Sequence, residues 1–182
     1  MKALVLAGVA FLAIGLASPV SAADLKVGDP APDFTLKASD GKTYKLSDFK
    51  GKQAIVLAWY PAAFTQGCTI ECKSLAEKGH LIKKYDVTYF MASTDGLEGE
   101  KGNIAFAQAY KADFPLLSDP TKEVATSYGV LNARGSAAQR WTFYIDKTGV
   151  ISYIDKEVNA HLATSAEFMA DKLGELKVAE KK

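Results

Sequence analysis

The chain has 182 residues and carries 22 basic against 21 acidic side chains, a formal net charge of +1. This balance gives no electrostatic reason to expect binding to nucleic acid or to an anionic membrane surface. Two cysteines are too few for a disulfide scaffold in a chain of this size, so an apolar core must supply the stability and the pair is better suited to chemistry.

The N-terminal residues have the pattern of a secretory signal peptide. Lys2 is followed by an apolar run over residues 3–17 and then by small residues up to position 22. A permanent anchor is the alternative, but the run is shorter than the ~20 residues that a membrane-spanning helix needs. We therefore predict a signal peptide over residues 1–22. One domain over residues 23–182 would follow, in a periplasmic or secreted protein that keeps no membrane segment after cleavage.

Further along, stretches that predict strands alternate with stretches that predict helices. Short apolar or alternating runs bounded by turn residues predict strands at residues 34–37, 43–46, 54–59, 87–92, 141–145 and 150–154. Apolar residues at helical spacing predict helices after Cys68, at about residues 102–110, after Asp119-Pro120 and from Thr164 to about Leu176. This order predicts an α/β fold, with helices on both faces of a central mixed β-sheet and a β-hairpin at the N-terminus.

Turn and cap residues refine these boundaries. Gly41 and Gly149 lie in the turns of two predicted hairpins, where glycine allows a positive φ angle. Asp119-Pro120 predicts a cap followed by proline in the first helical position. Thr164 with Glu167 predicts a capping box at the start of the last helix.

Both cysteines follow the most apolar run of the predicted domain, residues 54–59. Pro61 ends this buried strand, and the apolar spacing beyond it predicts an amphipathic helix of about four turns that begins near Cys68. At a helix start, unpaired N–H groups and the positive end of the helix dipole favour an anion. We therefore expect the Cys68 thiolate to be stabilised relative to the thiol.

The spacing Pro-x-x-x-Thr-x-x-Cys, formed by Pro61, Thr65 and Cys68, resembles the active-site motif of the peroxiredoxins. Gly67-Cys68-Thr69, with a second cysteine close behind, resembles their bacterioferritin-comigratory (Q-type) branch. The resemblance implies a thioredoxin-like fold and a thiol-dependent peroxidase that reduces hydrogen peroxide or small organic hydroperoxides. Cys68 would be the peroxidatic cysteine, and no metal or other cofactor is implied.

Two further segments, residues 27–34 and 140–146, are similar to segments of the same family, and the second supplies Arg140 at the position of the family's active-site arginine. Arginine would stabilise the thiolate and offer a fork of donors to a peroxide oxygen. Thr65 would hydrogen-bond the peroxide, and Pro61, which has no N–H, would keep water off the sulfur. The alternatives are that Thr65 only caps the helix, that Pro61 only ends a strand and that Arg140 is a surface cation.

Cys72 lies four positions after Cys68, whereas the Q-type branch usually has one more residue between its cysteines. On an intact helix the two Cβ atoms would be about 5–6 Å apart, and a disulfide needs roughly 3.5–4.5 Å. Pairing therefore requires the first helical turn to unwind. We predict an intramolecular disulfide between Cys68 and Cys72 that a thioredoxin-like or other dithiol reductant reduces. Alternatively, Cys72 is a small buried apolar residue.

Two other functions fit a thiol pair in a thioredoxin-like domain. A disulfide reductase of the thioredoxin type normally has Cys-x-x-Cys and a proline before the later hairpin, but no proline follows Pro120 here. A copper chaperone resembling the Sco family uses Cys-x-x-x-Cys, since thiolates suit Cu(I), but adds a histidine where this chain has Arg140. His80 and His161 lie elsewhere, in a predicted helix and in the loop before the last helix. Peroxidase activity is therefore the favoured function.

The sequence leaves open which peroxide is preferred, which reductant restores the thiol and whether the protein is a monomer or a homodimer. Phe64, Trp59 and Trp141 are the candidates for an apolar pocket rim that would admit either kind of peroxide.

Overall fold

The computed structural model describes residues 24–181, so the predicted signal peptide over residues 1–22 lies outside the described residues. The described part of the chain forms one sheet of seven strands. The strands are β1 (Thr35–Ala38), β2 (Thr43–Lys45), β3 (Ala54–Trp59), β4 (Val87–Ser93), β5 (Leu116–Ser118), β6 (Thr142–Ile145) and β7 (Ile151–Asp155). The α-helices are α1 (Gln66–Lys78), α2 (His80–Lys83), α3 (Asn103–Ala109), α4 (Glu123–Ser127) and α5 (Ser165–Glu175). Three short 3-10 helices are η1 (Leu46–Phe49), η2 (Val158–Ala160) and η3 (Leu162–Thr164).

The sheet is mixed, with the spatial order β2-β1-β5-β4-β3-β6-β7. Strands β3, β4 and β5 run parallel to one another, and the remaining neighbours pair antiparallel. Strand β3 therefore lies between a parallel and an antiparallel neighbour, which confirms the predicted α/β fold with a central mixed sheet. The two predicted hairpins, β1–β2 and β6–β7, are both present.

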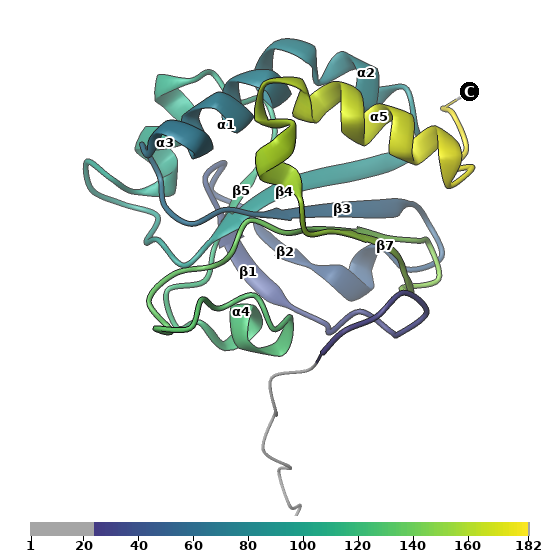
Figure 1. Cartoon of the computed structure of the whole chain (residues 1–182), viewed down its shortest axis with the longest axis horizontal. Helices are drawn as coiled ribbons and strands as arrows, with labels where there is room; N and C mark the ends of the chain where they lie inside the picture. The colour runs from purple at the N-terminus through teal and green to yellow at the C-terminus, as the bar shows by residue number, and fades with distance from the viewer. Residues whose placement is uncertain (1–23, 182) are drawn as a thin grey trace, which may run out of the picture.

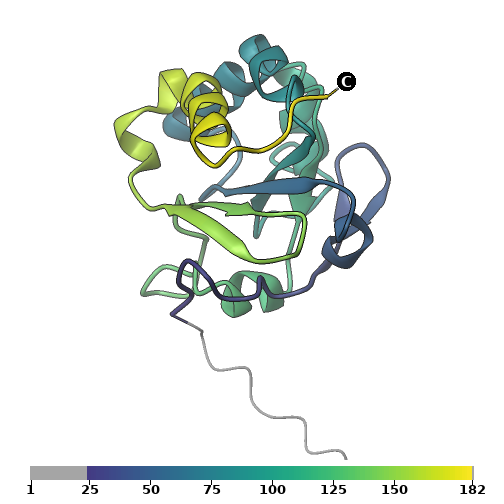
Figure 2. The same cartoon turned by 90° about the vertical axis from the view of Figure 1, so that its right-hand side faces the viewer.

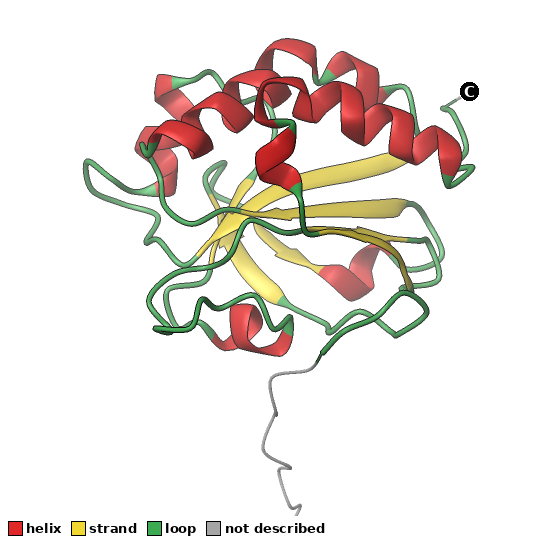
Figure 3. Ribbon diagram, viewed as in Figure 1, coloured by secondary structure: helices red, strands yellow, loops and turns green. Residues whose placement is uncertain are grey.

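Every residue of β3 is buried, because helices cover both faces of the sheet. Val56 and Ala58 face a core formed with α1, α2, α3 and α5, whereas Ile55, Leu57 and Trp59 face a second core formed with α4 and η1. Figures 1 and 3 show α1, α2 and α5 above the strands and α4 below them, and Figure 2 shows the same layers from the side. The alternation of side chains along β3 thus decides which residues share a layer with α1.

The glycines predicted in the hairpin turns have the positive φ angles that the turns require, +80° at Gly41 and +87° at Gly149. The helix predicted to run about four turns, α1, ends at Lys78 with Gly79 as its C-cap, and Leu81 and Ile82 of the predicted helix lie on the separate short helix α2. Gly79 is packed so tightly that a Cβ atom there would lie 2.3 Å from the hydroxyl of Tyr89.

One predicted helix start was wrong in detail. Helix α4 begins at Glu123 rather than directly after Asp119-Pro120, because Lys122 takes a left-handed conformation with φ at +64°. The Asp119 carboxylate still serves the helix, since it accepts a hydrogen bond from the Ala125 amide at 2.7 Å.

The capping box predicted at α5 does not form. Thr164 occupies the N-cap position, but its hydroxyl donates to the His161 carbonyl at 3.3 Å. Glu167 pairs with Lys78 instead of folding back onto the cap, because α1 presents this cation to it. Within residues 24–181, no helix is both long enough and apolar enough to cross a membrane.

Candidate active site

Cys68 is the third residue of α1 and is fully buried, as expected for a cysteine in the first turn of this helix. The Thr69 amide donates to the Thr65 carbonyl at 2.9 Å, which is the helical bond that closes the first turn. The amides of residues 66–68 precede that bond and belong to the turn whose N–H groups lack helical partners. The Cys68 sulfur therefore lies where backbone dipoles favour negative charge.

Arg140 donates from Nη2 to the Cys68 sulfur at 3.1 Å. The sheet produces this contact, because β6 pairs antiparallel with β3 and the Trp59 amide continues the ladder by donating to the Trp141 carbonyl at 2.9 Å. Arg140, two residues before β6, is thereby placed beside the connection from β3 to α1. Arg140 is buried, with 8% of its surface exposed, so the alternative of a surface cation is wrong.

Gly67 makes room for the guanidinium group. A Cβ atom at this position would lie 3.0 Å from Arg140 Nη2 and 3.4 Å from Leu162 Cδ1. A larger residue would therefore push the arginine away from the sulfur next to it. The close approach of Arg140 thus explains why the Gly67-Cys68-Thr69 motif has a glycine at its first position.

Glu71 is a site residue that the sequence analysis missed. It is fully buried, and its Oε2 accepts a hydrogen bond from Nη1 of Arg140. Burial raises the pKa of Glu71 to about 7, even though the Arg140 charge acts in the opposite direction. Burial likewise opposes the charge of Arg140, but Glu71 and Cys68 outweigh it and raise the pKa of Arg140 above its ordinary value. A charged residue three positions after Cys68, on the buried face of an amphipathic helix, was the signal that could have found Glu71.

Asn159 on η2 is the second residue that was missed. Its Oδ1 accepts a hydrogen bond from Arg140 Nε at 3.0 Å. The guanidinium group is therefore bonded to Cys68, Glu71 and Asn159 through three different nitrogen atoms. Neither composition nor helical spacing relates Asn159 to Arg140, because the contact depends on the path of the chain after β7.

Cys72 lies on the same buried side of α1 as Cys68, and both thiols are free. Burial raises the pKa of Cys72 to about 12, and the negative charges of Glu71 and Cys68 add to the rise. The Cys72 thiol is therefore neutral at physiological pH and packed in the core.

Asp95 holds the connection from β3 to α1, residues 60–65, through a hydrogen bond to its backbone. The Asp95 Oδ2 atom accepts a hydrogen bond from the Ala63 amide at 2.7 Å.

Phe64 has a φ angle of +62°, which is uncommon for a residue with a side chain. Pro61 is half-buried and lies two positions after the last residue of β3. Thr65 occupies the N-cap position, but its hydroxyl donates to the Ala62 carbonyl at 2.9 Å and does not cap the helix.

The predicted pocket rim needs correction. Trp59 is fully buried and packs against Tyr128 on the opposite face of the sheet from Cys68, because it alternates with the residues that face α1. Trp141 packs against that same second core and lies under Lys156, whose Nζ is 4.2 Å from the ring. Phe64 is 38% exposed and contacts Phe106 edge-on, so it stays a candidate for the rim.

The histidines do not lie in a cluster of metal ligands. His80 is exposed on α2, and His161 lies between η2 and η3 with its Nε2 atom 2.8 Å from Asp155 Oδ2. In the described range 24–181, no group of three or more His, Cys, Asp or Glu side chains is arranged to hold a metal ion.

The mixed sheet, with a buried cysteine at the start of the helix after β3, is that of a thioredoxin-like protein. The sequence matches the AhpC/TSA family over residues 27–154, and the chain belongs to this family. It is 40% identical over 128 residues to a chloroplastic peroxiredoxin Q of Triticum aestivum, which covers 70% of this chain and 57% of the relative. It is 34% identical over 147 residues to a putative peroxiredoxin bcp of Coxiella burnetii, which covers 76% of this chain and 95% of the relative.

Among solved structures, the peroxidoxin BcpB of Mycobacterium tuberculosis is similar to the chain with a TM-score of 0.73 and 28% identity, over 83% of this chain and 97% of that one. The chain thus spans little more than half of the wheat relative and nearly all of the two bacterial ones.

Proposed function

We propose that this protein is a thiol-dependent peroxidase that reduces hydrogen peroxide or small organic hydroperoxides, with Cys68 as the peroxidatic cysteine. The observation that carries the proposal is the contact between Arg140 Nη2 and the Cys68 sulfur at 3.1 Å, in the first turn of α1. A cation and a helix start both favour the thiolate, which is the nucleophilic form of cysteine. Membership of the AhpC/TSA family and relatives named peroxiredoxin support the same function.

In the first step the Cys68 thiolate attacks one oxygen of the hydroperoxide, so that an S–O bond forms while the O–O bond breaks. Cys68 becomes a sulfenic acid, and the other oxygen leaves with the bonding electron pair and takes up a proton to form water or an alcohol. Arg140 donors face the sulfur, so they are placed to stabilise the negative charge that moves onto the leaving oxygen.

Thr65 and Pro61 are proposed to shape the pocket in front of the sulfur. The Thr65 hydroxyl already donates to the Ala62 carbonyl, so its oxygen is left to accept a hydrogen bond from the O–H of the peroxide. Pro61 contributes an apolar surface without an N–H group. Glu71 is proposed as a positioning residue, because it binds the opposite nitrogen of the same guanidinium group.

In the second step the Cys72 thiol attacks the sulfenic acid, a disulfide forms and water leaves. An external dithiol, thioredoxin-like or other, then reduces the disulfide and is itself oxidised. The first turn of α1 must open for this step, because Cβ atoms four positions apart on an intact helix are about 5–6 Å apart and a disulfide needs about 3.5–4.5 Å. Hydrogen bonds in such a turn contribute about 0.5–1.5 kcal/mol each, so the opening is energetically accessible.

We also propose that the protein is exported to the periplasm or secreted, because residues 1–22 have the pattern of a cleavable signal peptide. The reductant would then be an exported protein with a reactive dithiol.

The proposal is tested by measuring peroxide consumption by the purified protein in the presence of dithiothreitol. The intact protein is expected to turn over, and Cys68→Ser is expected to lose all turnover. Full activity of Cys68→Ser combined with loss of activity in Cys72→Ser would reverse the assignment, and an inactive intact protein would refute the proposed function.

A further inference from the structure

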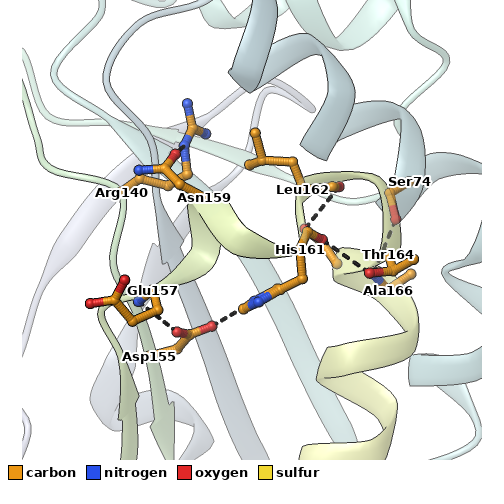
Figure 4. A network of polar contacts seen from close by, with 10 residues as sticks. Ser74, Arg140, Asp155, Glu157, Asn159, His161, Leu162, Thr164 and Ala166 are labelled. Carbon is orange, nitrogen blue, oxygen red and sulfur yellow. Dashed lines mark hydrogen bonds and ion pairs between the residues drawn. The ribbon is translucent and has the colours of Figure 1, made fainter.

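The connection between β7 and α5, residues 156–164, contacts the candidate active site at two points. Asn159 on η2 accepts the hydrogen bond from Arg140 Nε at 3.0 Å (Figure 4). Leu162 on η3 comes so close to Gly67 that its Cδ1 atom lies 3.4 Å from where a Cβ atom would stand. The same short segment therefore contacts both the arginine and the helix turn that carries Cys68.

This segment is held at its centre by His161. The His161 Nε2 atom lies 2.8 Å from Asp155 Oδ2 at the end of β7, and a carboxylate can only accept, so the ring nitrogen donates. The imidazole also stacks on Phe168 of α5, with ring centroids 3.8 Å apart and planes 13° apart. Figure 4 shows the His161 ring pointing from the connection toward Asp155. His161 thus joins β7 to α5 across the connection.

The start of α5 is in turn attached to α1. The Ser165 hydroxyl donates to the Leu162 carbonyl at 3.0 Å, and the Ala166 amide donates to the Ser74 hydroxyl at 3.2 Å. Ser74 lies on the helix that begins with Cys68. The connection is therefore tied at one end to β7, which pairs with the strand that follows Arg140, and at the other end to α1, which carries Cys68.

We propose that residues 156–164 form a strap that positions Arg140 over Cys68, with Asn159 as its contact and His161 as its anchor. A guanidinium group is a rigid plane with donors on three nitrogens. Cys68 and Glu71 occupy two of them, and Asn159 on the third prevents the plane from turning about the other two contacts. Asparagine is a neutral acceptor, so it holds the arginine without adding a further negative charge to compete with the thiolate.

Asn159 and His161 act through Arg140, so both are positioning residues. The inference rests on the proposed function in that the reaction served is peroxide reduction by Cys68. Its own content, however, is the position of Arg140 against the Cys68 sulfur, and the resulting reactivity of the thiol can be followed by alkylation without any peroxide. The two proposals can therefore fail separately.

The test measures the rate at which iodoacetamide alkylates Cys68 as a function of pH, in a Cys72→Ser background that leaves one thiol. Asn159→Ala is expected to slow alkylation at pH 7 by about two- to tenfold, the factor that corresponds to one lost hydrogen bond, because Arg140 is then held less firmly against the sulfur. Asn159→Asp keeps an acceptor oxygen but adds the negative charge that competes with the thiolate, so it is expected to leave alkylation slower than with asparagine. Glu157→Ala is the matched control, an exposed side chain on the same connection.

His161 is tested by His161→Phe, which keeps the stack on Phe168 but loses the bond to Asp155. It is expected to shift the alkylation profile in the same direction as Asn159→Ala, and to slow the reaction with hydrogen peroxide by a similar factor. Circular dichroism establishes that each variant is folded. Identical alkylation rates for Asn159→Ala and Glu157→Ala at every pH would overturn the proposal that residues 156–164 position Arg140. If Asn159→Ala slows alkylation but the intact protein never consumes peroxide, the positioning role of residues 156–164 stands and the proposed peroxidase function is refuted.

Discussion

The Nη2 atom of Arg140 lies 3.1 Å from the sulfur of Cys68, although 72 positions separate the two residues in the chain. The antiparallel pairing of β3 with β6 brings them together, since the residues just after β3 and just before β6 meet at one end of the sheet. The environment of the thiol is therefore a property of the folded sheet and not of the local motif alone. Denaturation should remove it.

Replacement of Arg140 should slow the reaction of Cys68 with peroxide. Arg140→Met removes the charge and all donors, so we expect less thiolate at pH 7 and a peroxide step slower by about 100-fold or more. Arg140→Lys keeps the charge and loses the planar fork, so it should recover part of the loss. Stopped-flow kinetics measure the rate of the peroxide step, and the rate of alkylation reports the amount of thiolate. Unchanged values in both variants would remove Arg140 from the mechanism.

Glu71 should make the stability of the protein depend on pH. Its pKa is raised from 4.5 to about 7 by burial, so the folded protein binds the proton more tightly than the unfolded chain. Stability is then highest below pH 4.5 and falls as the pH rises through 7, by about 3 kcal/mol for this residue. Glu71→Gln removes this dependence. Urea unfolding of both proteins at pH 5 and pH 8 measures it, and parallel pH profiles would contradict the expectation.

Asp95 should stabilise the connection that carries Pro61 and Thr65, because it accepts the hydrogen bond from the Ala63 amide. Asp95→Ala is expected to lower the free energy of unfolding by about 1–3 kcal/mol, the cost of an amide left without its charged partner. The peroxide step should slow as well. Asp171→Ala, at an exposed position of α5, is the control and should change stability by less than about 0.5 kcal/mol. Equal stability of the two variants would show that Asp95 does not fix the loop.

The fate of the Cys68 sulfenic acid tests the role of Cys72. We expect one equivalent of peroxide to produce a disulfide between them, seen as a loss of two hydrogens in the tryptic peptide over residues 53–73. Because the pKa of Cys72 is raised to about 12, its thiol should react only after the first turn of α1 opens. A lasting sulfenic acid, or a disulfide only between two chains, would make this a one-cysteine or intersubunit enzyme.

The sequence was sufficient to predict the elements that depend on local pattern. The buried strand before Cys68, the helix start near Cys68 and both hairpins follow from apolar spacing and from glycine at the turns. The position of Arg140 followed from the family resemblance, and the structure supplies its physical reason in the pairing of β3 with β6.

The errors concern features that only the three-dimensional arrangement decides. Trp59 was expected at the pocket rim, but side chains alternate along β3 and direct it to the other face of the sheet. Glu167 was expected in a capping box, but Lys78 of a neighbouring helix binds it. Glu71 and Asn159 were missed because their common partner, Arg140, is distant from both in the chain.

The most direct test of the central claim is the detection of a sulfenic acid on Cys68. The Cys72→Ser variant is treated with one equivalent of hydrogen peroxide in the presence of dimedone, and the tryptic peptides are analysed by mass spectrometry. We predict one dimedone adduct, on Cys68 and proportional to the peroxide added, that is absent after denaturation in urea before treatment. An unmodified Cys68 with the peroxide left unconsumed would contradict the account.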